Sequence, residues 1–313
     1  MDEILNHLLE NGLYFLEKYH NDNKFNKGFC CDLNASFSWR KNDISNIITT
    51  KNFTFDFDLI LDDAFKKAKR AKQAILNVKN PNIYTKKDKS YVTDADLLAN
   101  KELMRLGRFS VVSEENINVY IKDGKLILPD IFWLVDPLDG TNSYIKHRKD
   151  FCICVALVYK ERPILGLIYD VVEDLCVYAS VKSKIHIYHN KKTTLFSNML
   201  FKLQNKKPNK TLQDKVFLSS SRSLNYKFYE KNGAKCVAQA SAIKFLKIAL
   251  SKYHGLLRSE NLSFWDICAG DFLVFASGGA MFCDNGYIKY NQIKMPSFCA
   301  FDKSWIFDSD LSI

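Results

Sequence analysis

The sequence lacks the features that would place the chain in a membrane or on a secretion route. No run of about 18 uncharged apolar residues occurs in its 313 residues, so we expect no membrane span. The first 20 residues carry acidic residues at their head and no small-residue cleavage site, which argues against a secretion signal.

Cysteine patterns typical of disulfide-rich domains are also missing. The nine cysteines are an odd number without framework spacing, and no CxxC pair occurs. Cys152 and Cys154 stand two apart on an expected strand, and we interpret them as small packing residues. Reduced thiols in a cytoplasmic protein are therefore expected.

Arginine is scarce in an otherwise basic chain. The net charge is +10, which raises the question of a nucleic-acid partner, yet only eight arginines occur and the lysines are scattered. The denser run at 65–73 has apolar neighbours at helical spacing, so its lysines are expected on a solvated face. We therefore expect no nucleic-acid partner, and a charge that helps to attract a small anionic substrate.

The patterning predicts a mixed α/β or α+β chain with strands and helices in layers and no internal repeat. We expect an N-terminal extension (1–55), a metal-binding lobe (56–190) and a C-terminal lobe that completes the active site (191–313). A polar stretch near 190–213 is the expected seam. The expected helices are 1–20, 56–78, the second half of 86–106, 241–253 and one from 264 to Gly278. The expected strands are 109–113, 132–136, 152–159, 164–172, 177–181, 184–189 and 216–221.

Carboxylates follow the ends of several apolar elements. Because such ends can converge at one rim, we expect a cluster of unpaired acids, which is stable only when cations or protons neutralise it. No histidine lies in these runs, and all-oxygen ligands favour Mg²⁺, with Mn²⁺ possible, over zinc. The acids are Asp96, Glu114, Glu115, Asp136, Asp139 and Asp266.

The run DPLDGT at 136–141 concentrates this chemistry in one turn. Pro137 fixes its own φ and can aim the Leu138 carbonyl inward as a further ligand. Gly140 lets its own N–H and that of Thr141 point at an anion. Metals and N–H donors together can hold a phosphate and activate a water for attack. The alternative is a capped surface turn, since Asp, Pro and Gly all form turns.

Four ordered motifs resemble the inositol monophosphatase superfamily, a group of metal-dependent, lithium-sensitive phosphomonoesterases. These motifs are KKDKSYVTDAD, VVSEE, WLVDPLDGT and WDICAGDFLVFASGG, within residues 56–305. The resemblance implies a five-layered αβαβα sandwich of the sugar phosphatase type, often a homodimer, with two or three Mg²⁺ ions. Residues 1–55 have no counterpart in the family core, and we interpret them as a packing or dimer-covering extension.

The resemblance also implies metal ligands. Glu114, Asp136 and the Leu138 carbonyl would hold the first Mg²⁺. Asp136, Asp139 and Asp266 would hold the second, and Glu114 would help with a weaker third.

The catalytic roles implied by the resemblance fall on Asp96, Thr141 and Glu114. Asp96 would pair with the Thr141 hydroxyl, which together with Glu114 orients the attacking water. The implied substrate contacts are Gly140, Thr141, Ser221, Ser241, Lys244, Arg258 and Asp266.

Within the superfamily, SSSRS at 219–223 and SAIKF at 241–245 resemble the 3′(2′),5′-bisphosphate nucleotidase branch. There a lysine in the second segment binds the second phosphate of the substrate, and here it would be Lys244. The best-supported substrate is 3′(2′)-phosphoadenosine 5′-phosphate, hydrolysed to AMP and phosphate by metal-activated water. The sequence departs from this branch at Tyr91, 142–144, Leu224, Ala240 and Leu262.

These departures leave other functions open. Inositol 1-phosphate is the nearest alternative substrate, and sugar bisphosphates follow. A catalytically silent, RNA-associated protein is the alternative from another class. The intact acidic set speaks against it, because a silent protein has no use for carboxylates that repel one another.

Overall fold

The computed structural model describes residues 56–196, 212–220, 226–259, 262–284 and 286–305, and a few residues of the first 55. Among those few, β1 (Asp32–Leu33) pairs with β2 (Trp39–Arg40). The remainder of the expected extension lies outside the described residues, together with Ser221 and Leu224. Of the helices that the structure describes, none is both long and apolar enough to cross a membrane.

Helices α3 (Phe57–Asn77) and α4 (Asp94–Leu103) form the first layer, as expected for 56–78. Asp56 caps α3 by accepting two backbone N–H groups. The buried side of α3 carries Ile60, Leu61, Ala64, Ala68, Ala71 and Ile75, at the spacing of one helix face. Two short hairpins lie outside the large sheets: β3 (Ile83–Thr85) with β4 (Tyr91–Thr93), which contacts α4, and β6 (Ile121–Lys122) with β7 (Lys125–Leu126), which follows the 3-10 helix at Ile117–Tyr120.

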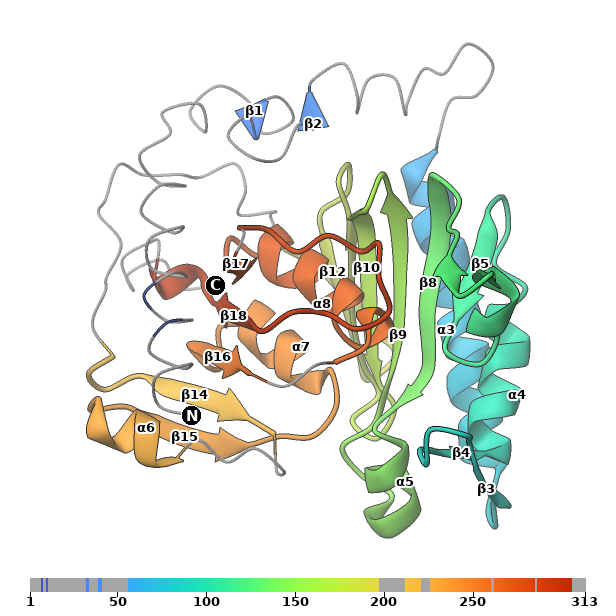
Figure 1. Cartoon of the computed structure of the whole chain (residues 1–313), viewed down its shortest axis with the longest axis horizontal. Coiled ribbons are helices and arrows are strands. Elements are labelled where there is room, and N and C mark those ends of the chain that lie inside the picture. Colours follow the sequence, from blue (N-terminus) through green and yellow to red (C-terminus); the bar gives the residue numbers. More distant parts are fainter. Residues whose placement is uncertain are drawn as a thin grey trace.

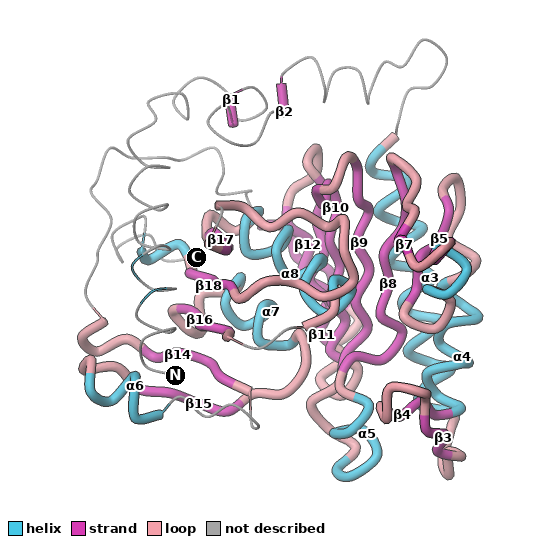
Figure 2. Tube along the Cα trace, in the orientation of Figure 1, coloured by secondary structure: helices cyan, strands magenta, loops and turns pink. Residues whose placement is uncertain are grey.

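The second layer is a seven-stranded sheet whose order is β13-β12-β11-β10-β9-β8-β5 (Figures 1 and 2). Only β5 and β8 pair in parallel within it. The edge strand β13 lies in the polar stretch expected as a seam from 190, so the sheet extends past that point. The strands are β5 (Ser110–Ser113), β8 (Ile131–Asp139), β9 (Cys152–Tyr159), β10 (Arg162–Asp170), β11 (Leu175–Ser180), β12 (Ile185–His189) and β13 (Lys192–Phe196).

Helices α7 (Ile243–Ala249) and α8 (Phe264–Ala276) form the third layer, on the other face of that sheet (Figure 1). Helix α8 is apolar almost all round because it is enclosed between two sheets. The helix expected over 241–253 is shorter, since Ser251 has a left-handed φ of 53°.

A five-stranded sheet, ordered β15-β14-β16-β18-β17, forms the fourth layer. Helix α6 (Tyr226–Lys231) packs beside β15, and its Phe228 and Tyr229 join the apolar cluster on this sheet. The fold is therefore the layered α/β sandwich that the sequence predicts. The strands are β14 (Val216–Ser219), β15 (Lys235–Ala238), β16 (Gly255–Arg258), β17 (Ala280–Cys283) and β18 (Phe298–Phe301).

A buried polar group joins the middle helix layer to the first sheet. Arg162 on β10 donates to Asp271 on α8 at 2.7 Å, and the Tyr290 hydroxyl donates to the same carboxylate at 3.0 Å. Because each charge has a partner, this buried ion pair is tolerated and fixes α8 against the sheet.

Candidate active site

A bulge at the end of β8 brings two aspartates to one face of the sheet. Asp136 lies opposite Cys154 and Asp139 lies opposite Cys152, so β8 has one more residue than β9 across this interval. Side chains alternate between faces in a regular strand, and residues three apart would point to opposite sides. The extra residue restores the same side for both carboxylates, and Leu138 packs in the core next to α3 and α4.

Asp266, on helix α8, completes a group of three carboxylates with Asp136 and Asp139 of β8. It lies in the first turn of α8, and one oxygen from each of Asp136, Asp139 and Asp266 lies within 4.8 Å of the others. Burial and mutual repulsion raise the pKa of Asp136 and of Asp266 well above the ordinary value. An all-oxygen set with this excess of negative charge fits a hard divalent cation.

Glu114 lies near this group and has a partner that sequence reasoning missed. Lys86 donates to Glu114 at 2.7 Å and to Glu115 at 2.8 Å. Burial alone would lower the pKa of Lys86, but the attraction of the two carboxylates outweighs it and raises that pKa. Lys86 is the first residue of the motif KKDKSYVTDAD, and its place in that motif could have identified it as a residue of the site.

Asp96 and Thr141 are in contact, as the resemblance implies. The Thr141 hydroxyl donates to Asp96 Oδ1 at 2.9 Å, and it lies 3.1 Å from the Leu138 carbonyl oxygen. The other oxygen of Asp96 accepts from the backbone N–H and the hydroxyl of Thr93 in the capping box of α4. Burial raises the pKa of Asp96. The helix cap thus holds one carboxylate oxygen toward Thr141.

Gly140 shapes the turn between β8 and α5 (Thr141–His147). Its φ is +98°, and a Cβ placed there would lie 2.8 Å from the Asp150 carbonyl oxygen and 3.1 Å from the Cβ of Ser241. A side chain is excluded both by conformation and by space. The turn therefore brings Ser241 next to the DPLDGT segment.

Lys244 and Arg258 place positive charge beside the acidic group. Both side chains are buried, and Lys244 donates to the Ser241 carbonyl at 2.6 Å. Burial lowers the pKa of Lys244, whereas the charge of Asp139 opposes that effect. Asp139 accepts the Ala242 N–H at the start of this segment. Burial raises the pKa of Asp139, and Lys244 and that N–H counteract the rise.

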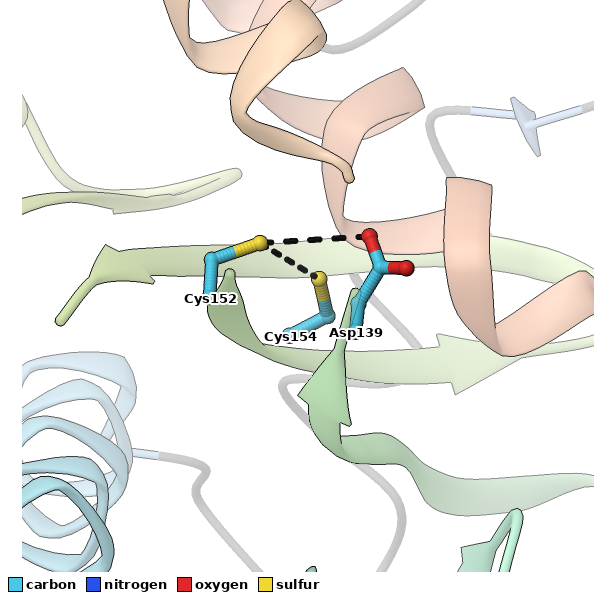
Figure 3. Close-up of side chains that lie close together, drawn as sticks. All are labelled: Asp139, Cys152 and Cys154. Carbon is cyan, nitrogen blue, oxygen red and sulfur yellow. Dashed lines mark hydrogen bonds between the residues drawn. The ribbon is translucent and has the colours of Figure 1, made fainter. Parts of the chain in front are cut away.

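Cys152 and Cys154 lie on the same side of the sheet as Asp139 (Figure 3). Both are buried, as the interpretation as packing residues requires. They also contact the acidic group: Cys152 Sγ lies 3.9 Å from Asp139 Oδ2 and 3.9 Å from Cys154 Sγ. The sequence indicated their burial but not this contact, because the bulge on β8 aligns them with Asp139.

The structure therefore brings most of the expected site residues to one rim, and their roles stay predictions. Ser221 lies outside the described residues. The residues at the rim or next to it are Asp96, Glu114, Asp136, Leu138, Asp139, Gly140, Thr141, Ser241, Lys244, Arg258 and Asp266.

Comparisons with known proteins show which family this chain resembles. The model of the inositol monophosphatase family matches residues 54–298. The 3′(2′),5′-bisphosphate nucleotidase CysQ of Buchnera aphidicola is 27% identical over 235 residues, which are 70% of this chain and 83% of that protein. The protein of the same name from Shigella flexneri is 27% identical over 233 residues, 70% of this chain and 88% of that one.

A solved structure shares the fold. CysQ from Bacteroides thetaiotaomicron superposes with a TM-score of 0.62 at 24% sequence identity, covering 79% of this chain and 98% of that one. The family match covers most of the chain and includes all four motifs, the last of which lies mainly in α8. The chain therefore belongs to the inositol monophosphatase family, and it is a phosphoric monoester hydrolase.

Proposed function

We propose that this chain is a Mg²⁺-dependent phosphomonoesterase that hydrolyses 3′(2′)-phosphoadenosine 5′-phosphate to AMP and phosphate. The observation that carries the proposal is a group of three repelling carboxylates with two buried cationic side chains beside it. Metal cations would neutralise the carboxylates, and an anion would neutralise Lys244 and Arg258. The names of the two curated relatives support the substrate class.

Asp136, Asp139 and Asp266 would hold Mg²⁺, and Glu114 and the Leu138 carbonyl would contribute further oxygens. When bound, such cations neutralise charge on the phosphoryl group and the leaving oxygen and lower the pKa of water. Mn²⁺ has the same preference for oxygen ligands and remains an alternative ion.

Thr141 would orient the attacking water. Its hydroxyl carries one proton, and donating that proton to Asp96 Oδ1 leaves the oxygen lone pairs free to accept from a water. Because the other Asp96 oxygen is held by Thr93, the carboxylate cannot rotate away from Thr141. Glu114 would take a second hydrogen bond from the same water. Positioning of this kind lowers the barrier without a nucleophilic side chain.

The N–H groups of Gly140 and Thr141 would take the phosphate. Gly140 has the left-handed backbone that such a turn needs, and a side chain there would collide with the 150–151 segment. Ser241 lies next to the turn and would add a hydroxyl contact.

Lys244 would bind the second phosphate of the substrate. An ammonium group has three donors; one is held by the Ser241 carbonyl at 2.6 Å and a second, more weakly, by the Gln239 carbonyl at 3.5 Å. Among the described residues, no carboxylate lies within ion-pair distance of Lys244. Arg258, buried on β16, adds a second charge to this region.

The test is phosphate release with Mg²⁺ from three substrates side by side: 3′-phosphoadenosine 5′-phosphate, inositol 1-phosphate and fructose 1,6-bisphosphate. The proposal expects the nucleotide to have the highest kcat/KM. A preference for inositol 1-phosphate would assign the chain to the other branch, and release from none would favour a silent protein.

Asp139→Asn is the matched variant for this assay. It keeps the shape of the side chain and an acceptor for the Ala242 N–H, but it removes a ligand charge. We expect turnover to be abolished and activation by Mg²⁺ to weaken. Activity near that of the wild type would refute the assignment of the metal ligands.

Further proposals follow the family resemblance. The enzyme would be a cytoplasmic homodimer that lithium inhibits, with a metal-binding lobe over 56–190 that β13 (Lys192–Phe196) extends and a C-terminal lobe over the rest of 191–313. The mass of the protein in solution tests the homodimer, and phosphate release in the presence of Li⁺ tests the inhibition by lithium.

A further inference from the structure

Two thiols and one carboxylate oxygen form a compact triangle at the edge of the acidic group. Cys152 Sγ lies 3.9 Å from Cys154 Sγ and 3.9 Å from Asp139 Oδ2, and ligand atoms of all three residues lie within 4.8 Å of one another. Figure 3 shows the three side chains pointing toward one another from β9 and from the end of β8. Their arrangement follows from the strands, since residues two apart share a face.

Two of the three sides of this triangle match a tetrahedral cation site, and the third, between Cys154 Sγ and an Asp139 oxygen, is at most 4.8 Å. With metal–sulfur and metal–oxygen distances of about 2.3 and 2.0 Å, two tetrahedral ligands lie about 3.8 Å apart for two sulfurs and about 3.5 Å apart for a sulfur and an oxygen. The observed separations of 3.9 Å are within a few tenths of an ångström of these values. Small side-chain rotations would complete the geometry without backbone movement.

We propose that Asp139, Cys152 and Cys154 form a binding site for a thiophilic divalent cation such as Zn²⁺. Two sulfurs and one oxygen are ligands that zinc prefers and Mg²⁺ avoids. The fourth position would be open to water, and Asp139, which is partly exposed, provides the entry side. The site is thus different in chemistry from the all-oxygen group, although the two share Asp139.

The shared carboxylate has a consequence for the enzyme. A cation held by both thiols would draw Asp139 away from Asp136 and Asp266, so Zn²⁺ and Mg²⁺ would exclude one another. This consequence rests on the proposed function, whereas binding of the thiophilic cation does not. Burial raises the pKa of the Cys152 thiol, and the hydrogen bond with Cys152 together with burial raises the pKa of the Cys154 thiol, so the cation must displace both protons as it binds.

The test is a titration of the metal-free, full-length protein with Co²⁺ alone, which gives a charge-transfer absorption when thiolates bind it. All proteins carry Cys30→Ser and Cys31→Ser, so that these residues contribute no signal. We expect the absorption to saturate at one equivalent and Zn²⁺ to abolish it. In Cys152→Ser and in Cys154→Ser, affinity should fall by at least about 100-fold, the upper range for losing even an outer-shell partner.

Cys176→Ser is the matched control, because Cys176 is equally buried on a strand of the same sheet and belongs to no such cluster among the described residues. Its Co²⁺ absorption should equal that of the parent protein. Urea unfolding shows which variants are folded, and either cysteine variant suffices for the test. No thiolate absorption in the parent, or absorption that survives both substitutions, overturns the site. Since no substrate is used, that result leaves the phosphatase proposal intact.

Discussion

Replacing Asp136 with asparagine should stabilise the metal-free protein while it destroys the metal site. Asp136 is buried, and burial together with repulsion from Glu114, Asp139 and Asp266 raises its pKa well above the ordinary value. Asparagine retains an oxygen to accept the Leu138 N–H, which now donates to Asp136 Oδ1 at 3.0 Å. The substitution therefore removes charge and keeps the local hydrogen bond.

The size of the effect follows from the separation of the carboxylates. Two ionised oxygens no more than 4.8 Å apart repel by at least about 3.5 kcal/mol at an effective dielectric constant of about 20. Taking up a proton at pH 7 instead costs a carboxyl group of ordinary pKa about 4 kcal/mol. The folded, metal-free protein adopts whichever state of Asp136 costs less, the ionised or the protonated one. Asparagine removes that cost, so we expect Asp136→Asn to raise the free energy of unfolding by about 3 kcal/mol.

Urea unfolding at pH 7, first with a chelator and then with Mg²⁺, measures this directly. In the wild type, Mg²⁺ at a hundred times its Kd should add about 2.7 kcal/mol. Mg²⁺ should stabilise the variant far less. The difference in free energy of unfolding between the variant and the wild type should therefore shrink or change sign when Mg²⁺ is added. Phosphate release should be lost at every Mg²⁺ concentration.

Asp271→Asn, on helix α8, provides the contrasting control. Asp271 is also a buried aspartate with a raised pKa, but its charge is paired with Arg162. Removing it leaves a buried arginine uncompensated and should destabilise the fold by about 3 kcal/mol, with or without Mg²⁺. If Asp136→Asn destabilised the metal-free protein in the same way, mutual repulsion at the cluster would be refuted.

Two further predictions concern Lys244 and Asp302. Lys244→Ala should raise KM for a nucleotide bisphosphate at least about tenfold more than for a phosphate monoester, the difference expected from one charge-assisted contact; equal effects would remove Lys244 from the second-phosphate site. Burial, partly offset by the Ser304 hydroxyl and Lys215, raises the pKa of Asp302 to about 6. Because the fold then takes up this proton before the unfolded chain does, its stability should rise by about 2 kcal/mol as the pH falls from 7 to 4. Asp302→Asn should lack that contribution in urea unfolding, and an unchanged pH profile would contradict the shift.

Cys152 and Cys154 show how far a pattern can be interpreted. Their spacing on an apolar run predicts burial, and both are buried. Alternation alone would set Asp139 on the opposite face from Asp136, and only one of the two could then meet the thiols. The bulge in β8 changes that parity, and no residue type marks it unambiguously, because Pro137 and Gly140 also suit an ordinary turn.

Lys86 and Ala242 illustrate a second limit. A lysine among lysines carries no sign of its partner, yet Lys86 pairs with Glu114 and Glu115 some 28 and 29 positions away. The Ala242 N–H, 103 residues from Asp139, is a backbone group that every residue except proline has. Partners of this kind depend on how distant segments pack, which local patterns do not encode.

By itself, the sequence determined the layered α/β fold, the family and the acidic character of the site. Hydrophobic periodicity specifies each element, and Asp96, Glu114, Asp136, Asp139 and Asp266 follow such elements in four recognisable motifs. The tertiary structure decided which of these side chains share a face, which lysine and arginine side chains lie beside them, and where two thiols lie. The physical reason is that repulsion, burial and coordination depend on distance in space, and the bulge on β8 and the approach of α7 and α8 set those distances.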